Sequence, residues 1–255
     1  MADRLSFGAE FADFWRFVRR PTLRRLPGRH PHGGLAGDWT PNIGFARLMA
    51  WAGVLWAINL FALGPIAVMA AGAGGAVHRL DPMNIPWLAA VLWAPLVEEL
   101  LFRHGLRRPL QALWLCPLLL PPILLGPMGW TVAWVACLMI VLCLPLRRGR
   151  AQLKGWRTAW RREYVRRYGM VFHLVSITFA AVHLNNFTLQ GMAVYMLPLL
   201  VLPQWMTGMV LGWMRTRRGI GAAILLHGVF NGGPVLFIML MAGLTQNLPI
   251  PMPQQ

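Results

Sequence analysis

The chain has few acidic residues and few charged residues of any kind. Its 255 residues include only 8 Asp and Glu against 24 Lys and Arg, and 13% of all residues are charged. Soluble domains carry about twice that share. With 57% hydrophobic residues and a mean hydropathy of +0.52, the composition excludes a disordered chain and an ordinary cytosolic enzyme. It favours a protein embedded in a membrane.

Cysteine is scarce as well, and a secretory signal is missing from the start of the sequence. Cys116, Cys137 and Cys143 all lie inside apolar runs. This placement excludes a disulfide scaffold and predicts three small buried hydrophobic side chains. The first apolar run follows about forty polar and basic residues, so the N-terminus is expected to stay in the cytoplasm.

Long apolar runs are abundant, and no repeat of fixed period relates them. They predict an all-α, polytopic bundle of about seven transmembrane helices. The third run contains Pro117, Pro121, Pro122 and Pro127 and is expected to be kinked or re-entrant. The seven runs cover residues 45–70, 86–106, 110–127, 129–146, 169–189, 191–214 and 220–243.

The basic residues test this topology. If the N-terminus is cytoplasmic, all of the 24 Lys and Arg residues except Arg79 fall on the cytoplasmic side. Cytoplasmic loops of membrane proteins carry such an excess. Most of the net charge of +16 therefore indicates orientation in a membrane rather than binding to nucleic acid.

The chain divides into four predicted parts. Residues 1–42 form a cytoplasmic segment, residues 43–85 a first span and outer loop, residues 86–243 a membrane core, and residues 244–255 a short outer tail. The first part contains an amphipathic helix that is expected to lie on the membrane surface, or alternatively to pack on the protein itself. Its apolar residues are Phe7, Phe11, Phe14, Trp15 and Val18. The core includes a basic, aromatic cytoplasmic loop, residues 147–168, which is predicted to be interfacial.

Two of the eight acidic residues stand apart from the rest. Glu98 and Glu99 lie inside an apolar run, whereas the other six are expected in loops or surface segments. A carboxylate in a membrane costs at least about 2.5 kcal/mol and indicates a functional site or a structural polar contact. Glu99 precedes Arg103 by four residues, the favourable order for an ion pair. Glu98 has no such partner, and its apolar setting suits a general base.

Two further polar clusters interrupt apolar runs. His183 follows Phe179 by four residues, and His227 precedes Asn231 by four, so each pair shares one helix face. In the predicted topology, Glu98, His183, His227 and Asn231 all lie within about 6 Å of the membrane mid-plane. These side chains are therefore expected to form one buried polar site.

The segments VEELLFRHG, FAAVH and HGVFN, which begin at Val97, Phe179 and His227, resemble the three motifs of the CPBP (or Abi) family. These proteins are intramembrane glutamic endopeptidases related to the type II CAAX prenyl endopeptidases. The resemblance covers roughly residues 86–243. Two features depart from the family pattern. His104 stands where the family often has Gly, and an inserted hairpin, spans three and four, lengthens the distance from Glu98 to His183.

The resemblance implies catalytic roles for four residues. Glu98 and His183 would hold and activate water, while His227 and Asn231 would stabilise the oxyanion. It also implies that Glu99 and Arg103 support the site. Phe179, which belongs to the same motif as His183, is a further supporting residue. The remaining histidines, His30, His32, His78, His104 and His173, are expected to have structural roles.

The leading hypothesis is an endopeptidase of the bacterial inner membrane that needs no cofactor. No Ser or Cys accompanies the polar groups, so no acyl-enzyme is expected. Its partners would be the lipid bilayer and a protein or peptide substrate, lipidated substrates included, without nucleic acid. A zinc protease using His183, His227 and a glutamate is the first alternative. A proton-coupled transporter and a non-catalytic membrane partner are the others.

Overall fold

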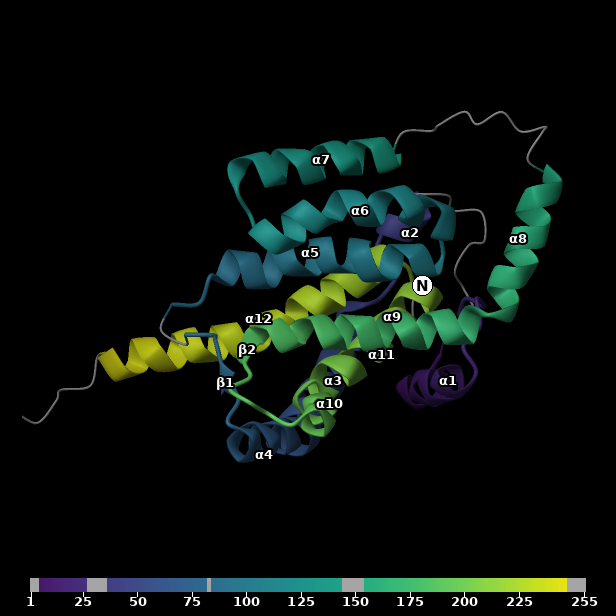
Figure 1. Cartoon of the computed structure of the whole chain (residues 1–255). Helices are drawn as coiled ribbons and strands as arrows, with labels where there is room; N and C mark the ends of the chain where they lie inside the picture. The colour runs from purple at the N-terminus through teal and green to yellow at the C-terminus, as the bar shows by residue number, and fades with distance from the viewer. Residues whose placement is uncertain (1–4, 27–35, 82–83, 144–153, 247–255) are drawn as a thin grey trace, which may run out of the picture.

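The computed structural model describes residues 5–26, 36–81, 84–143 and 154–246, and 81% of these described residues are helical. Figure 1 shows the helices gathered into a bundle. In the first half of the chain, the elements are α1 (Phe7–Arg19), α2 (Ala36–Trp39), α3 (Phe45–Ile58), the π-helix η1 (Asn59–Leu63), α4 (Gly64–Gly74), the π-helix η2 (Ala89–Trp93), α5 (Ala94–Glu98), the π-helix η3 (Glu99–Arg103) and the 3₁₀-helix η4 (His104–Leu106).

The second half of the chain is also helical. Its elements are α6 (Pro109–Leu125), α7 (Gly129–Cys143), α8 (Lys154–Arg166), α9 (Tyr168–Val182), the 3₁₀-helices η5 (His183–Asn186) and η6 (Val194–Met196), α10 (Leu197–Leu200), α11 (Leu202–Arg217) and α12 (Ile220–Gln246). Two short strands, β1 (Val77–His78) and β2 (Phe187–Thr188), pair antiparallel and join the ends of α4 and α9.

Helix α11 is the centre of the molecule. Every residue from Thr207 to Arg217 is buried, and α9 and α12 pack along it. A helix that is buried all round needs polar partners for its charged residues. The basic residues at its end find them in the N-terminal segment.

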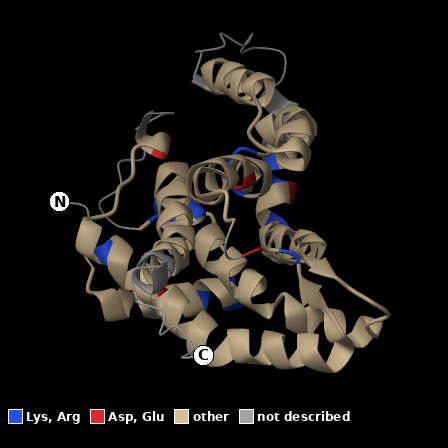
Figure 2. Ribbon diagram, turned by 90° about the vertical axis from the view of Figure 1, so that its left-hand side faces the viewer, with Lys and Arg blue, Asp and Glu red and all other residues tan. Residues whose placement is uncertain are grey.

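Acidic residues near the N-terminus neutralise this buried end of α11. Arg215 Nη1 lies 2.7 Å from Asp38 Oδ1, and Arg218 forms an ion pair with Glu10. Glu10 and Asp38 are only 1% and 2% exposed. The expectation that all six remaining acids are peripheral is therefore wrong for these two, because the sequence pattern does not reveal which distant arginines they meet. Helices α4, α6, α7, α9 and α12 contain no Lys, Arg, Asp or Glu, and most of the ribbon in Figure 2 accordingly carries no charge.

The amphipathic helix α1 packs on the protein itself. Phe14 and Phe17 are buried and Trp15 is 37% exposed. The ring of Phe14 lies 5.8 Å from that of Trp51 in α3 and 6.0 Å from that of Trp213 in α11. The apolar face of α1 therefore covers the protein core, as in the alternative given for this segment, and does not face lipid as in the first expectation.

Three helices in the described part are long and apolar enough to cross a membrane: Phe45–Gly74, Tyr168–Asn186 and Ile220–Met241. A fourth is obtained if Val194–Leu200 and Leu202–Arg217, bent by 52°, count as one span. Large apolar side chains face outward on these and neighbouring helices, among them Phe61, Leu124 and Phe237 at 84%, 79% and 63% exposure. Such a surface fits contact with lipid.

The predicted second span is interrupted by two π-helices, and proline explains the first. The amide of Ala94 bonds to the carbonyl of Ala89, which is the i to i+5 pattern of a π-helix. The next amide in this pattern is missing because residue 95 is proline. The carbonyl of Ala90 instead accepts a hydrogen bond from Asn231 Nδ2 at 2.9 Å. The sequence motif residue Asn231 is thereby tied to this irregular helix.

The hairpin of α6 and α7 covers α5 and η3 on the outer side of the bundle (Figure 1). Pro117, Pro121 and Pro122 all lie inside α6. Since Pro122 has no amide proton, the carbonyl of Leu118 lacks its helical donor, and Trp134 Nε1 of α7 supplies one at 2.8 Å. The carbonyl that proline leaves without a donor thus allows a hydrogen bond between the two helices.

Candidate active site

A buried ion pair forms the base of the candidate site. Arg103 Nη1 lies 3.0 Å from Glu99 Oε1, and both side chains are 0% exposed. The predicted contact between residues 99 and 103 is confirmed. Both belong to the π-helix η3, and π-helical turns are frequent at functional sites.

His227 of α12 lies between the two adjacent glutamates. Its Nδ1 is 2.9 Å from Glu99 Oε1, and its Nε2 is 3.8 Å from Glu98 Oε2. The His227 side chain is 4% exposed and that of Glu98 is 17% exposed. Helices α5 and α12 pack together, so the first and third sequence motifs meet in space.

Phe179 and His183 of the second motif complete one wall. The guanidinium carbon of Arg103 lies 3.6 Å from the centre of the Phe179 ring, a cation–π contact. The ring of His183 lies 4.6 Å from the ring of Phe179, and His183 Nδ1 lies 2.7 Å from the Phe179 carbonyl oxygen. His183 is also close enough to Glu98 and His227 for Coulombic interaction.

A glycine missed in the sequence allows α11 to close the site. A Cβ atom at Gly208 would lie 3.0 Å from Phe179 Cδ1 and 3.4 Å from Arg103 Nη2. Both distances are shorter than most Cβ contacts, so any side chain here would push on the ion pair or its aromatic cover. In the sequence, Gly208 is one small residue in an apolar run, and nothing there distinguishes it from the other glycines.

Asn231 stands one helical turn beyond His227. The contact it makes is the hydrogen bond to the Ala90 carbonyl described above. Its amide nitrogen has a second proton. The structure thus brings Glu98, Glu99, Arg103, Phe179, His183 and His227 into one cluster and places Asn231 beside it.

Glu98 differs from Glu99 in what surrounds it. Glu99 is engaged by both Arg103 and His227. Glu98 Oε2 is buried and, like Glu99 Oε2, forms no hydrogen bond with any described residue, but the Glu98 side chain as a whole is 17% exposed. Of the two carboxylates, Glu98 is therefore the one that water and substrate can approach.

Other histidines and cysteines have structural contacts. His173 Nε2 lies 3.1 Å from the Val18 carbonyl oxygen, and His104 Nε2 lies 2.9 Å from Gln111 Oε1. His78 Nδ1 accepts from the Leu80 amide. Cys116 is half-buried, but Cys137 is exposed on α7, so the prediction of burial is wrong for Cys137. His30, His32 and the side chain of Cys143 lie outside the described residues.

No three His, Cys, Asp or Glu residues of the described part stand close enough to hold a metal ion. The predicted zinc set of His183, His227 and a glutamate is therefore not assembled as a metal site in this structure.

Comparison with known proteins places the chain in a family. No curated protein and no solved structure matches it. The model of the family "Type II CAAX prenyl endopeptidase Rce1-like" matches residues 82–233, which include Glu98, His183, His227 and Asn231. This match agrees with the resemblance seen in the three motifs. The chain therefore belongs to the type II CAAX prenyl endopeptidase Rce1-like family, which makes it an integral membrane peptidase.

Proposed function

We propose that the protein is an intramembrane glutamic endopeptidase that hydrolyses a peptide bond of a membrane-associated protein or peptide. Glu98 and His183 bind and activate a water molecule. His227 and Asn231 stabilise the oxyanion. The observation that carries this proposal is the unequal environment of the two glutamates: Glu99 is held by Arg103 and His227, while Glu98 remains accessible beside the same histidine.

The reaction follows from these positions. Glu98 accepts a proton from water, and the water oxygen attacks the carbonyl carbon of the scissile bond. The resulting oxyanion accepts hydrogen bonds from His227 Nε2 and from the second N–H of Asn231. The carbon–nitrogen bond then breaks, and Glu98 passes its proton to the departing amine. No covalent intermediate with the protein forms.

The contact between His227 and Glu99 sets a condition on this mechanism. An ionised carboxylate only accepts hydrogen bonds, so Nδ1 of His227 must donate to Glu99. In a neutral imidazole, Nε2 would then carry a lone pair and no proton. Donation from Nε2 to an oxyanion therefore requires the doubly protonated ring.

The experiment compares Glu98→Gln with the wild type in cells, by proteomics of the membrane fraction. A precursor should accumulate uncleaved in the variant, and the purified variant should lose cleavage of that precursor while keeping its fold. Glu163→Gln is the matched control, because Glu163 lies on α8 and pairs there with Arg166 and Arg167. An unchanged cleavage pattern in Glu98→Gln would overturn the proposal and favour a non-catalytic partner.

Two further assays separate the proposal from its alternatives. Activity that survives treatment with EDTA and 1,10-phenanthroline is expected. Loss of activity that zinc restores would favour the zinc protease. Proton flux into liposomes without peptide cleavage would favour the transporter.

The proposal includes the predicted placement in the cell. Seven spans cross the bacterial cytoplasmic membrane with the N-terminus inside, and residues 86–243 form the protease core. The charge distribution of the sequence supports this orientation. Substrates are membrane-associated proteins or peptides, lipidated ones included, and no cofactor takes part.

A further inference from the structure

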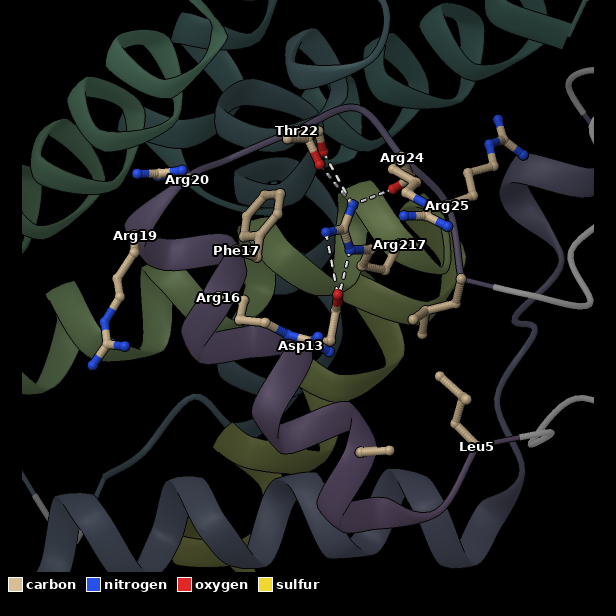
Figure 3. A pocket seen from close by; sticks show the side chains of 12 residues that line it. Leu5, Asp13, Arg16, Phe17, Arg19, Arg20, Thr22, Arg24, Arg25 and Arg217 are labelled. Carbon is tan, nitrogen blue, oxygen red and sulfur yellow. Dashed lines mark hydrogen bonds and ion pairs between the residues drawn. The ribbon is translucent and has the colours of Figure 1, made fainter.

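A strongly basic cavity is distinct from the candidate active site, since none of its described lining residues belongs to that site. It has a volume of about 690 Å³ and lies between α1, the segment after it and the end of α11. Figure 3 shows its lining seen from close by. Five arginines of the N-terminal segment contribute to it: Arg16, Arg19, Arg20, Arg24 and Arg25.

One ion pair organises the wall of this cavity. Arg217 is 5% exposed, and its Nε lies 2.8 Å from Asp13 Oδ2. Arg217 also donates to the carbonyl oxygens of Thr22 and Arg24, as the dashed lines in Figure 3 show. These bonds hold the segment that follows α1 against the end of α11. The cavity is thus built by tertiary contacts and is not a chance gap beside a loose chain.

The charge of the cavity is not balanced from within. Asp13 is the single carboxylate among its described lining residues, and it is engaged by Arg217 and by Trp213 Nε1. Within the described part of the chain, none of the five arginines from Arg16 to Arg25 forms an ion pair with a carboxylate. Burial, and then the neighbouring charges of Arg25 and Arg215, lower the pKa of nearby Arg107 to about 10.

The cavity lies level with the beginning of a membrane span. The ring of Phe17, one of its lining residues, is 4.9 Å from that of Phe172, and a Cβ atom at Gly169 would lie 3.5 Å from Pro21. Phe172 and Gly169 belong to the first turns of the candidate span Tyr168–Asn186. The end of an apolar span is the depth of lipid head groups. Leu5, Phe17 and Leu26 add apolar lining to the arginines.

We propose that this cavity binds the phosphate of an anionic phospholipid head group, with the exposed arginines as its ligands and the apolar lining in contact with the lipid backbone. Arginine suits phosphate because its planar guanidinium donates two parallel hydrogen bonds. Basic residues at a membrane surface attract anionic lipids. The bound lipid would fix α1 and the end of α11 to the bilayer.

The test measures lipid binding to the full chain purified in detergent, by native mass spectrometry and by the shift of the thermal unfolding midpoint. The probes are dioleoyl phosphatidylglycerol, dioleoyl phosphatidylcholine and inorganic phosphate. The triple variant Arg19→Gln, Arg20→Gln, Arg24→Gln removes three exposed cations. The matched control is Arg161→Gln, Arg162→Gln, Arg166→Gln, which removes the same charge from the exposed face of α8.

The expected result is one tightly bound phosphatidylglycerol and a raised unfolding midpoint for the wild type and the α8 control. The triple variant should bind it about tenfold more weakly or worse while unfolding, without lipid, at the wild-type temperature. Equal binding of phosphatidylcholine would overturn the proposal, as would equal losses in the two triple variants. Equally tight binding of inorganic phosphate would show that the ligand is a free anion and not a lipid.

Discussion

At the scale of single residues, two adjacent and identical side chains receive opposite environments. Glu99 is fully buried and bound by a cation and a histidine, whereas the Glu98 side chain is 17% exposed and its Oε2 forms no hydrogen bond with the described residues. Successive residues of a helix point about 100° apart, so the two side chains meet different neighbours. In the proposed mechanism, Glu99 therefore serves the stability of the molecule and Glu98 serves its chemistry.

Replacing each glutamate by glutamine separates these two contributions. Glu99→Gln leaves Arg103 buried without a counter-charge, so we expect it to destabilise the protein by about 3–5 kcal/mol. Glu98→Gln should keep an unfolding midpoint close to that of the wild type and abolish cleavage. Thermal unfolding in detergent measures the first effect and a cleavage assay the second. Equal stabilities of the two variants would contradict this division.

Gly208 gives a second prediction at this scale. Gly208→Ala puts a methyl group 3.0 Å from Phe179 Cδ1, and Phe179 cannot withdraw because Arg103 packs on its ring. Displacement of the site by a fraction of an ångström should lower the cleavage rate by about ten- to a hundredfold. Gly53→Ala on α3 is the control, since nothing lies within 4 Å of its added carbon, and it should stabilise the helix by about 0.5–1 kcal/mol. A Gly208→Ala enzyme of full activity would refute the argument.

At the scale of elements, irregular helices position the site. The carbonyl of Ala90 has no helical donor because residue 95 is proline, and Asn231 of α12 fills the gap. A close approach makes this possible: a Cβ atom at Gly228 would lie 2.9 Å from the Val91 carbonyl oxygen. The defect in one helix and the small residue in the other thus fix how α12 presents His227 to the two glutamates.

A double-mutant cycle tests this coupling between elements. Asn231→Ala leaves a part-buried carbonyl unpaired and should destabilise the protein by about 1–3 kcal/mol. Pro95→Ala restores an amide proton, so in its presence the cost of Asn231→Ala should fall. The free energies of unfolding of both single variants and the double variant give the coupling energy. Strict additivity would show that the carbonyl is not what Asn231 supports.

At the scale of the whole molecule, the basic residues have two roles. Many mark one side of the membrane in the predicted topology, but Arg103, Arg215 and Arg217 are buried in ion pairs. The net charge therefore reflects both orientation in the membrane and an internal network of ion pairs.

The number of spans is most open to test at the hairpin of α6 and α7. The described parts of these helices, 17 and 15 residues, are about 25 Å and 22 Å long, less than the roughly 30 Å of a bilayer core.

Cysteine labelling decides whether this hairpin crosses the membrane. In a variant without native cysteines, Met128→Cys places a thiol at the turn between α6 and α7, where Met128 is 50% exposed. Seven spans predict labelling by an impermeant maleimide from outside intact cells. Arg79→Cys should label in the same way, and Arg162→Cys only after permeabilisation. Protection of Met128→Cys beside a labelled Arg79→Cys would indicate a re-entrant hairpin.

The sequence by itself determined the membrane class, the helical fold, the family and the pair Glu99 and Arg103, because apolar runs and residues four apart on a helix act locally. Tertiary structure alone decided that His227 lies between both glutamates. It also decided that α11 can approach Phe179 closely at Gly208, and that Glu10 and Asp38 neutralise the end of α11. These contacts join residues more than 100 positions apart or depend on the space left by packed neighbours. No spacing along the chain encodes either, since burial and distance arise only once the helices pack.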